Sequence, residues 1–374
     1  IVYTSGTTGF SKGVVLPHRS LLRNVLFARR HMPLEAGDAL VSFLPLAHAF
    51  GCAFEFLFPV SVGCRVAFLD KTPSPQVILK AFAAEQPRLV LTVPLVLEKI
   101  YAKRVRPFLE KPAVKLLARI PAFRRRIDAL LRKKLLEAFG GRVIEVVVGG
   151  AALNPAVEEF FLRIGFPVTV GYGMTECGPL LTYASWREHK PQGVGRVVDG
   201  MELVVDSPDP ARVPGEVKVR GPHVMAGYYK SPEATREVLD EDGWLKTGDL
   251  GLLDPEGFLF LKGRSKTMFL GATGQNVYPE EIEARLNALP LVSESLVVER
   301  DHRLHALVYP DLEAADAAHV GHEAILREME RNRQKLNAKL PPFCQVASVE
   351  VVPEEFQKTP TKKIKRFLYA GRAG

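Results

Sequence analysis

The chain has 374 residues, of which 47% are hydrophobic and 25% charged, a composition that is ordinary for a soluble globular protein. Its length allows two or three domains, and no apolar run reaches the roughly 18 residues that a membrane-spanning helix needs. Lys and Arg outnumber Asp and Glu by 50 to 42, which fits a protein that meets anionic ligands: nucleotides, phosphorylated cofactors, membrane surfaces or nucleic acid.

The first distinctive stretch is "YTSGTTGFSKGV" at residues 3–14, which follows a short apolar start typical of a strand. Glycines let the backbone approach a ligand closely, and free N–H groups with Ser and Thr hydroxyls form a nest for phosphate oxygens. Lys12 adds a mobile positive charge. The stretch does not match the P-loop pattern G-x-x-x-x-G-K-[ST], but it predicts a loop that binds a polyphosphate.

Short apolar runs ended by Pro or Asp then alternate with helical patterns. The runs lie at 39–45, 64–70 and 88–94, and the helical patterns at 74–86 and 154–165. Because such runs are typical of buried strands, the alternation predicts an α/β fold with a largely parallel sheet. Two more apolar runs, at 142–153 and 166–176, pass from strand into glycine-containing loops.

The segment 98–142 is strongly basic, with 14 Lys or Arg residues against four Asp or Glu. One interpretation is a solvated helical face. The other is a surface for an anionic membrane or for the phosphates of an acyl carrier. Aromatic residues are sparse in the segment, which disfavours nucleic acid as a partner.

From about Gly193 the pattern changes to short strands separated by turns, at 201–206, 215–221 and 257–264, which predicts a small antiparallel barrel. A mixed segment follows Gly263. It contains an amphipathic helix over 322–340 whose apolar positions are predicted to face the core. These positions are Ile325, Leu326, Met329, Leu336 and Leu340.

The four cysteines indicate neither a zinc site nor a disulfide framework, because they are scattered and form no CxxC pair. They are Cys52, Cys64, Cys177 and Cys344. The cytoplasm is therefore the expected location, with a peripheral membrane contact as the alternative that the basic segment raises.

The loop at 3–14 resembles the signature loop of the adenylate-forming enzymes: acyl-CoA synthetases, peptide-synthetase adenylation domains and luciferases. Further stretches resemble the other motifs of this family, in the family's order. They are "LPLAHAFG" (44–51), "GGAAL" (149–153), "GYGMTECGP" (171–179), "GWLKTGDLG" (243–251), "GRSKTMFLGATGQNVYPEEIE" (263–283) and "KTPTKKIKR" (358–366). The resemblance covers essentially the whole chain, and "LPLAH" with "TPT…K.KR" is most similar to long-chain fatty-acid ligases.

The resemblance implies a set of residues that bind ATP and its metal. Glu176 would hold Mg²⁺, Thr175 would touch a phosphate, Tyr172 would stack on adenine, and Asp249 with Arg264 would contact the ribose. The remaining nucleotide-binding positions are Thr4, Ser5, Gly6, Thr7, Thr8, Gly9, Lys12, Gly149, Gly150, Ala151, Gly171 and Gly173.

The resemblance also assigns residues beyond the nucleotide. His48 would lie at the mouth of the acyl pocket, and Gly274 would line the tunnel for the pantetheine of coenzyme A. Lys363 would be the catalytic lysine that meets the carboxylate and the α-phosphate, with Lys362 and Lys365 as neighbouring candidates.

The implied fold has a large α/β domain over 1–192, a barrel-like subdomain over 193–263, a hinge at 264–266 with Lys266 as its pivot, and a mobile α+β domain over 267–374. In the family a substantial block precedes the phosphate loop. We therefore expect an upstream segment or a partner chain to supply it, unless a shortened version folds alone.

The implied reaction joins a fatty acid to coenzyme A through an acyl-adenylate, at the expense of ATP. One alternative is an acyl-AMP ligase that loads a carrier protein. Another is an inactive or regulatory binding half of a split synthetase. Retention of both Lys12 and the 358–366 motif argues for an active enzyme, because neither is needed for a fold.

Overall fold

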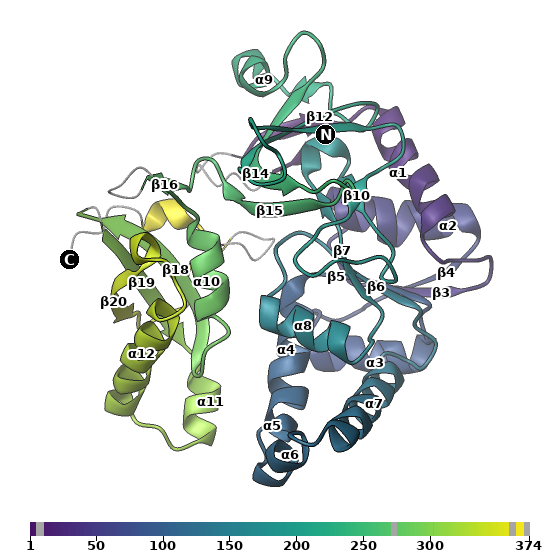
Figure 1. Cartoon of the computed structure of the whole chain (residues 1–374). Helices are drawn as coiled ribbons and strands as arrows, with labels where there is room; N and C mark the ends of the chain where they lie inside the picture. The colour runs from purple at the N-terminus through teal and green to yellow at the C-terminus, as the bar shows by residue number, and fades with distance from the viewer. Residues whose placement is uncertain (5–10, 271–274, 302, 359–363, 370–374) are drawn as a thin grey trace.

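The computed structural model of the chain describes residues 1–4, 11–270, 275–301, 303–358 and 364–369 (Figure 1). Two parallel sheets lie at the centre of the large α/β part. One pairs β3 (Ala39–Ser42) with β4 (Arg65–Phe68). The other has the order β5-β6-β7, formed by Leu89–Thr92, Glu145–Val148 and Val168–Val170. The parallel α/β arrangement predicted from the apolar runs is confirmed.

Helices surround these sheets. They are α1 (His18–His31), α2 (Phe58–Val62), α3 (Pro75–Glu85), α4 (Pro94–Ile100), α5 (Arg106–Leu109), α6 (Pro112–Leu117), α7 (Pro121–Ala138) and α8 (Pro155–Arg163), with π-helical turns η1 (Gly51–Leu57) and η2 (Tyr101–Val105). Many begin with Pro, which lacks the N–H that a first turn leaves unpaired. Two of these helices are also capped by a side chain: Ser74 accepts from the Val77 N–H at the start of α3, and Asn154 accepts from the Ala156 N–H at the start of α8.

Strand β4 departs from the expectation of a buried strand. Arg65 and Phe68 are exposed and the residues between them half-buried, whereas all four residues of β3 are buried. Strand β3 also adjoins β5, where the Arg88 N–H donates to the Ala39 carbonyl over 3.2 Å, whereas among the described residues β4 pairs only with β3. An apolar run alone does not distinguish an edge strand from a central one.

Within the described residues up to Arg264, the antiparallel strands form three sheets. The first is β1-β2-β13, formed by Val2–Tyr3, Gly13–Val15 and Gly227–Tyr228. The second is β10-β9-β8, formed by Arg196–Val197, Leu180–Tyr183 and Tyr172–Gly173. The third is β11-β12-β14-β15, formed by Glu202–Asp206, Gly215–Arg220, Leu245–Leu253 and Leu259–Arg264.

The third sheet occupies the segment expected to form a small barrel. Its strands are antiparallel as predicted, but within the described residues β11 and β15 do not pair, so the sheet is open. A short helix, α9 (Pro232–Val238), lies between β13 and β14. The overall prediction of an α/β fold with an antiparallel subdomain and a C-terminal α+β part is confirmed, with an open sheet in place of a closed barrel.

The C-terminal part is built on the mixed sheet β18-β19-β20, formed by Val292–Arg300, Arg303–Pro310 and Val346–Val351. Its helices are α10 (Pro279–Leu286), α11 (Leu312–Ala317) and α12 (His322–Asn337), and β16 (Phe269–Leu270) pairs with β17 (Asn276–Val277). The described residues also contain three 3-10 turns: η3 (Thr175–Cys177) in the large part, and η4 (Pro342–Cys344) and η5 (Arg366–Leu368) in the C-terminal part.

The predicted amphipathic helix is α12. Ile325, Met329 and Leu336 are buried in it, and Leu340 packs beside the same core. Leu326 was expected on the core face, but it is 44% exposed. It directly follows Ile325, so it points about 100° away from a core that Ile325 and Met329 already face.

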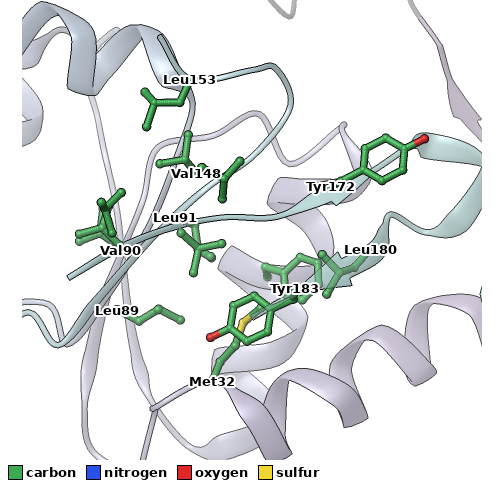
Figure 2. Packing of buried hydrophobic residues seen from close by; sticks show 14 of the residues in the cluster. Met32, Leu89, Val90, Leu91, Val148, Leu153, Tyr172, Leu180 and Tyr183 are labelled. Atoms are coloured by element: carbon green, nitrogen blue, oxygen red, sulfur yellow. The ribbon is translucent and has the colours of Figure 1, made fainter. Parts of the chain in front are cut away.

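The large part and the C-terminal part have separate hydrophobic cores. The first extends from Val14 to Leu259, and the second contains residues from Val277 to Val346. Figure 2 shows Leu91, Val148 and Leu153 packed together in the first core, with the Tyr172 ring at its margin and its hydroxyl directed away from them. Within the ranges that the structure describes, no helix is long and apolar enough to cross a membrane.

Candidate functional site

The candidate site begins at a hairpin formed by β1 and β2. Val2 pairs with Val14 and Tyr3 with Gly13, and the Thr4 N–H donates to the Lys12 carbonyl over 2.9 Å. These pairs close the base of the loop predicted to bind phosphate. Thr4 and Lys12 therefore lie side by side where the loop leaves the sheet. The other predicted loop residues, Ser5, Gly6, Thr7, Thr8 and Gly9, lie outside the described residues.

Lys12 and Glu176 are brought together through Tyr228. The Lys12 ammonium lies 4.6 Å from the centre of the Tyr228 ring, and the Tyr228 hydroxyl donates to Glu176 Oε1 over 2.9 Å. The neighbouring Met225 N–H donates to the Glu176 carbonyl over 2.8 Å, which fixes the backbone of η3. Burial and the Glu176 carboxylate raise the pKa of the Tyr228 hydroxyl, so Tyr228 stays a neutral donor.

Tyr228 was missed by the sequence analysis. Strand β13, which carries it, pairs with β2 at Gly227–Val15 and Tyr228–Val14, although some 210 residues separate the two strands in the sequence. The stretch "AGYYKSPEAT" at 226–235 has a turn-forming composition and lies between two predicted strands, so its local pattern indicates no site residue. Only the pairing with β2 places this ring beneath Lys12.

A second cluster joins Tyr172, Asp249 and Arg264. The Tyr172 hydroxyl donates to Asp249 Oδ2 over 2.6 Å, and Arg264 Nε lies 3.1 Å from Asp249 Oδ1. Asp249 and Arg264 face each other in the β14–β15 pair, which explains why the two stretches that carry them meet. Burial first, and then Asp249, raise the pKa of the Tyr172 hydroxyl well above its usual range. Arg264 remains partly exposed, so this cluster presents polar groups to solvent.

The predicted glycines lie at the carboxyl ends of neighbouring parallel strands. Gly149 and Gly150 follow β6, with Ala151 exposed beside them, and Gly171 follows β7. The Gly171 N–H donates to the Val148 carbonyl over 2.9 Å, which holds the two loops together. In open α/β sheets ligands bind at this edge.

Two of these glycines meet specific backbone demands. Gly150 has a φ of +87°, in the left-handed region that favours glycine. A Cβ at Gly173 would overlap the Pro179 carbonyl oxygen. The chain therefore needs glycine at both positions to build these loops.

His48 is half-buried in the loop that leads into η1, and burial lowers the pKa of its imidazole. Phe50, two residues later, packs so closely on Gly149 that a Cβ there would lie 3.1 Å from its ring. The "LPLAHAFG" stretch is therefore adjacent to the glycines that follow β6. This contact places the predicted acyl gate next to the predicted nucleotide loops.

Buried polar side chains of α1 support the loop that carries Thr175 and Glu176. Asn24 is fully buried; its Nδ2 donates to the Cys177 carbonyl over 3.1 Å, and its Oδ1 accepts from the Leu180 N–H over 2.9 Å. Ser20, one turn earlier, donates to the His223 carbonyl over 2.6 Å. Sequence analysis identified neither residue, because a polar side chain in a helix normally indicates a solvated face.

The predicted catalytic Lys363 and its neighbour Lys362 lie outside the described residues, as does Gly274. The chain on both sides of residues 359–363 is anchored in the C-terminal part. Lys358 pairs with Glu294, the Lys365 N–H donates to the Gln357 carbonyl over 2.8 Å, and Arg366 pairs with Glu283. Lys358 and Arg366 are therefore bound to carboxylates, unlike the side chains of a freely solvated basic tail.

Lys266, the predicted hinge, lies exposed in the turn between β15 and β16. On its N-terminal side, the Ser265 N–H donates to the Gly248 carbonyl over 2.9 Å; on its C-terminal side, Thr267 Oγ1 donates to Glu280 Oε1 over 2.7 Å. The turn thus joins a residue bonded to the β14–β15 sheet and a residue bonded to α10. Its role as a pivot stays a prediction.

The arrangement suits a nucleotide triphosphate with a divalent cation. Among the described residues Lys12 forms no ion pair, and its ammonium is available to an anion. Glu176 accepts from Tyr228 through one oxygen and keeps the other for a further partner. In the same ranges no group of three or more His, Cys, Asp or Glu is placed to hold a metal. A cation bound here would therefore share ligands with phosphate oxygens, the way Mg²⁺ usually binds.

Comparison with known proteins gives a consistent result. The family model described as "AMP-binding enzyme" matches residues 1–229, and "AMP-binding enzyme C-terminal domain" matches residues 267–368. The long-chain-fatty-acid–CoA ligase FadD15 of Mycobacterium bovis is 31% identical over 99% of this chain and 67% of its own length. The long-chain-fatty-acid–[acyl-carrier-protein] ligase AEE15 of Arabidopsis thaliana is 30% identical over 100% of this chain and 60% of its own.

Among solved structures, ATP-bound MatB from Rhodopseudomonas palustris superposes with a TM-score of 0.76 at 26% identity, over 99% of this chain and 67% of that one. The chain thus spans 58 to 67% of the length of the curated relatives that it matches over nearly its whole extent.

Proposed function

The chain belongs to the AMP-binding enzymes, and we propose that it activates a long-chain fatty acid with ATP and transfers the acyl group to the thiol of coenzyme A. One observation carries the proposal. Segments far apart in the sequence bring Lys12, Tyr228 and Glu176 together beside the Tyr172–Asp249–Arg264 cluster. The first cluster suits a triphosphate, and the second suits a sugar with two hydroxyl groups.

In the first step a carboxylate oxygen attacks the α-phosphorus of ATP. A new O–P bond forms, the bond to the bridging oxygen breaks, and pyrophosphate leaves with the electron pair. Negative charge that develops on the phosphates needs fixed cations nearby. Lys12 would supply one from the hairpin, and Lys363 would supply a second from the C-terminal part. Mg²⁺ held by Glu176 would neutralise phosphate charge.

In the second step the sulfur of the thiol attacks the acyl carbon. A C–S bond forms, the C–O bond to AMP breaks, and the thiol proton passes to solvent. Activation is necessary because a carboxylate is a poor electrophile, whereas AMP is a good leaving group. Rotation of the C-terminal part about Lys266 would exchange the groups that serve the two steps.

The acyl substrate is proposed from similarity. "LPLAH" and the tail motif resemble those of long-chain ligases, and the FadD15 relative carries that activity in its name. Each buried CH₂ group should add about 0.8 kcal/mol of binding free energy. Pyrophosphate release should therefore rise with chain length until the pocket is filled. A flat profile from acetate to palmitate, or a preference for aromatic acids, would reject this substrate class.

A carrier protein is the second candidate for the acceptor, favoured by the similarity to AEE15. The acceptor is tested by supplying presynthesised acyl-adenylate with either coenzyme A or a pantetheinylated carrier protein. We expect thioester formation with coenzyme A. Transfer to the carrier protein alone would replace the proposed acceptor, and absence of pyrophosphate release with every acid would reject the activity itself.

A further inference from the structure

The helices between β5 and β6 carry a surface that the proposed function does not use. Helices α5 and α6 have no buried residue, and α7 buries only Leu131 and Leu135. In Figure 1 they lie at the lower end of the large part, the end opposite the β14–β15 sheet. Helices of one or two turns are marginal in water without packing. A contact along this side would stabilise them.

Exposed apolar side chains are concentrated here. Five large apolar residues between 116 and 130 each have 39 to 64% of their surface exposed to solvent. They are Leu116, Leu117, Ile120, Phe123 and Leu130. The first four lie at the end of α6, in the connection and in the first turn of α7. Phe123 and Leu130 are seven residues apart, so they share one face of α7. Single exposed apolar residues are common, but a contiguous group indicates a contact surface.

Basic side chains surround this apolar group. Within the described residues, Lys111, Lys115, Arg119, Arg124, Arg125 and Arg126 form no ion pair with a carboxylate. The Arg126 guanidinium instead lies 5.9 Å from the centre of the Phe123 ring. Cations and large apolar groups therefore occupy the same surface over residues 111–130, with Asp128 turned to Arg163 at 3.5 Å.

We propose that residues 111–130 bind the surface of an anionic lipid bilayer. Apolar side chains can enter the boundary between headgroups and acyl chains while Lys and Arg contact lipid phosphates. A soluble acidic protein would match the charge but would not require five exposed apolar residues. Such a contact would be peripheral, at the surface of the bilayer. This proposal does not rest on the proposed function.

The test is sedimentation of the full chain with vesicles of phosphatidylcholine, with or without phosphatidylglycerol, at low and at high salt. We expect binding that requires phosphatidylglycerol and weakens with salt. The triple variant Leu116→Ser, Ile120→Ser, Phe123→Ser should bind at least about tenfold more weakly. The triple variant Lys115→Glu, Arg119→Glu, Arg124→Glu should also bind at least about tenfold more weakly. Each basic residue near an anionic surface changes the affinity for vesicles several-fold.

Matched controls are Leu326→Ser, an exposed leucine of α12, and Lys339→Glu, an exposed lysine that follows this helix. Both should bind vesicles like the parent chain. All four variants alter exposed side chains, and circular dichroism checks that each is folded. Adenylate formation from a water-soluble acid should be unchanged in all of them, which separates this proposal from the proposed function.

Three results would overturn the proposal. The first is absence of vesicle binding by the parent chain. The second is unchanged binding by the triple serine variant, which would reduce the contact to charge alone. The third is binding of an acidic carrier protein through residues 111–130 in a chain that does not sediment with vesicles, which would assign the surface to a protein partner.

Discussion

At the scale of single residues, Tyr228 is the link between Lys12 and Glu176, and its hydroxyl orients the carboxylate proposed to hold Mg²⁺. Tyr228→Phe keeps the ring beneath Lys12 and removes only the donor. A hydrogen bond to a charged group is worth about 1.5–3 kcal/mol, so acid-dependent ATP–pyrophosphate exchange should fall about tenfold or more. Raising the Mg²⁺ concentration should recover part of the loss.

Tyr229→Phe is the matched control for this prediction, because Tyr229 is the next residue and is 48% exposed. In the Tyr229→Phe variant the rate of ATP–pyrophosphate exchange should stay close to that of the parent chain. Equal rates in the two variants would show that the Tyr228 hydroxyl does not support the carboxylate.

Glu55 gives a second prediction at this scale. It is fully buried in η1, and its Oε2 accepts from Ser42 Oγ and from the N–H groups of Phe43 and Leu44 at 2.8 to 3.1 Å. Among the described residues its Oε1 has no partner. Burial raises the pKa of this carboxyl to about 8, against the opposing effect of these three hydrogen bonds. The folded chain therefore keeps a proton that the unfolded chain releases near pH 4.5.

This difference in pKa destabilises the folded chain as the pH rises from about 4.5 to about 8, by as much as about 1.4 kcal/mol per pH unit. Glu55→Gln is neutral at every pH and can keep the three bonds through its carbonyl oxygen. Its free energy of unfolding in urea, relative to the parent chain, should rise across this range and then level off. Glu241→Gln, at an exposed position, should show no such trend. A constant difference for Glu55→Gln would contradict the raised pKa.

The residues that could be identified from the sequence were those in local motifs. Asp249 and Arg264 belong to stretches with recognisable composition, and the structure places Arg264 Nε 3.1 Å from Asp249 Oδ1. Tyr228, Asn24 and Glu55 could not be identified, because each acts through a partner far along the chain or through burial. Asn24 bonds to Leu180, 156 residues away, and nothing in either local pattern records that pairing.

At the scale of elements, α1 holds the Thr175–Cys177 turn through Asn24. Asn24→Leu keeps the approximate volume but leaves the buried Leu180 N–H and Cys177 carbonyl without this partner. Each unpaired buried group costs about 1–3 kcal/mol, so we expect roughly 3 kcal/mol less stability toward urea. Leu22→Ala, at an exposed position of the same helix, should change stability by about 0.5 kcal/mol or less. Similar losses in both variants would show that the hydrogen bonds of Asn24 do not stabilise the Thr175–Cys177 turn.

The boundaries of strands and helices could largely be predicted, whereas their partners could not. Residues 88–94 contain β5 and residues 154–165 contain α8, as their apolar periodicity indicates. The same apolar patterns wrongly predicted that β4 is buried and that Leu326 faces the core. Pairing of β2 with β13 and the openness of the β11–β15 sheet depend on contacts between distant segments, which local patterns do not contain.

At the scale of the whole molecule, polar contacts join the large part and the C-terminal part within the described residues, among them the ion pair between Lys262 of β15 and Glu281 of α10 at 3.2 Å. Asn154, the cap of α8, donates through Nδ2 to the Ala284 carbonyl over 3.1 Å, and Lys103 pairs with Glu313 at 2.7 Å. The Lys103–Glu313 pair is exposed, and such pairs contribute little to stability. Partly exposed polar contacts of this kind would let the C-terminal part change its orientation at low cost, as the proposed two-step reaction requires.

Lys266→Pro tests whether that change occurs at the turn between β15 and β16. Proline fixes φ near −65°, and a pivot must change its backbone angles while the parts on either side stay rigid. Within the described residues the Lys266 N–H donates no backbone hydrogen bond, so proline removes none. We expect one half-reaction, either adenylate formation or thioester formation from presynthesised acyl-adenylate, to survive. The other should fall by at least about an order of magnitude.

Glu241→Pro provides the control, because Glu241 lies in an exposed turn between α9 and β14 and its N–H likewise donates no backbone hydrogen bond that the described residues accept. Both half-reactions should persist in it. A rigid turn can lock only one orientation of the C-terminal part. Proline at a true pivot must therefore lower the rate of one half-reaction and leave the other, whereas general destabilisation lowers both rates together. Parallel loss of both half-reactions in Lys266→Pro would therefore reject Lys266 as the pivot, and no loss in either would place the pivot elsewhere between β15 and α10.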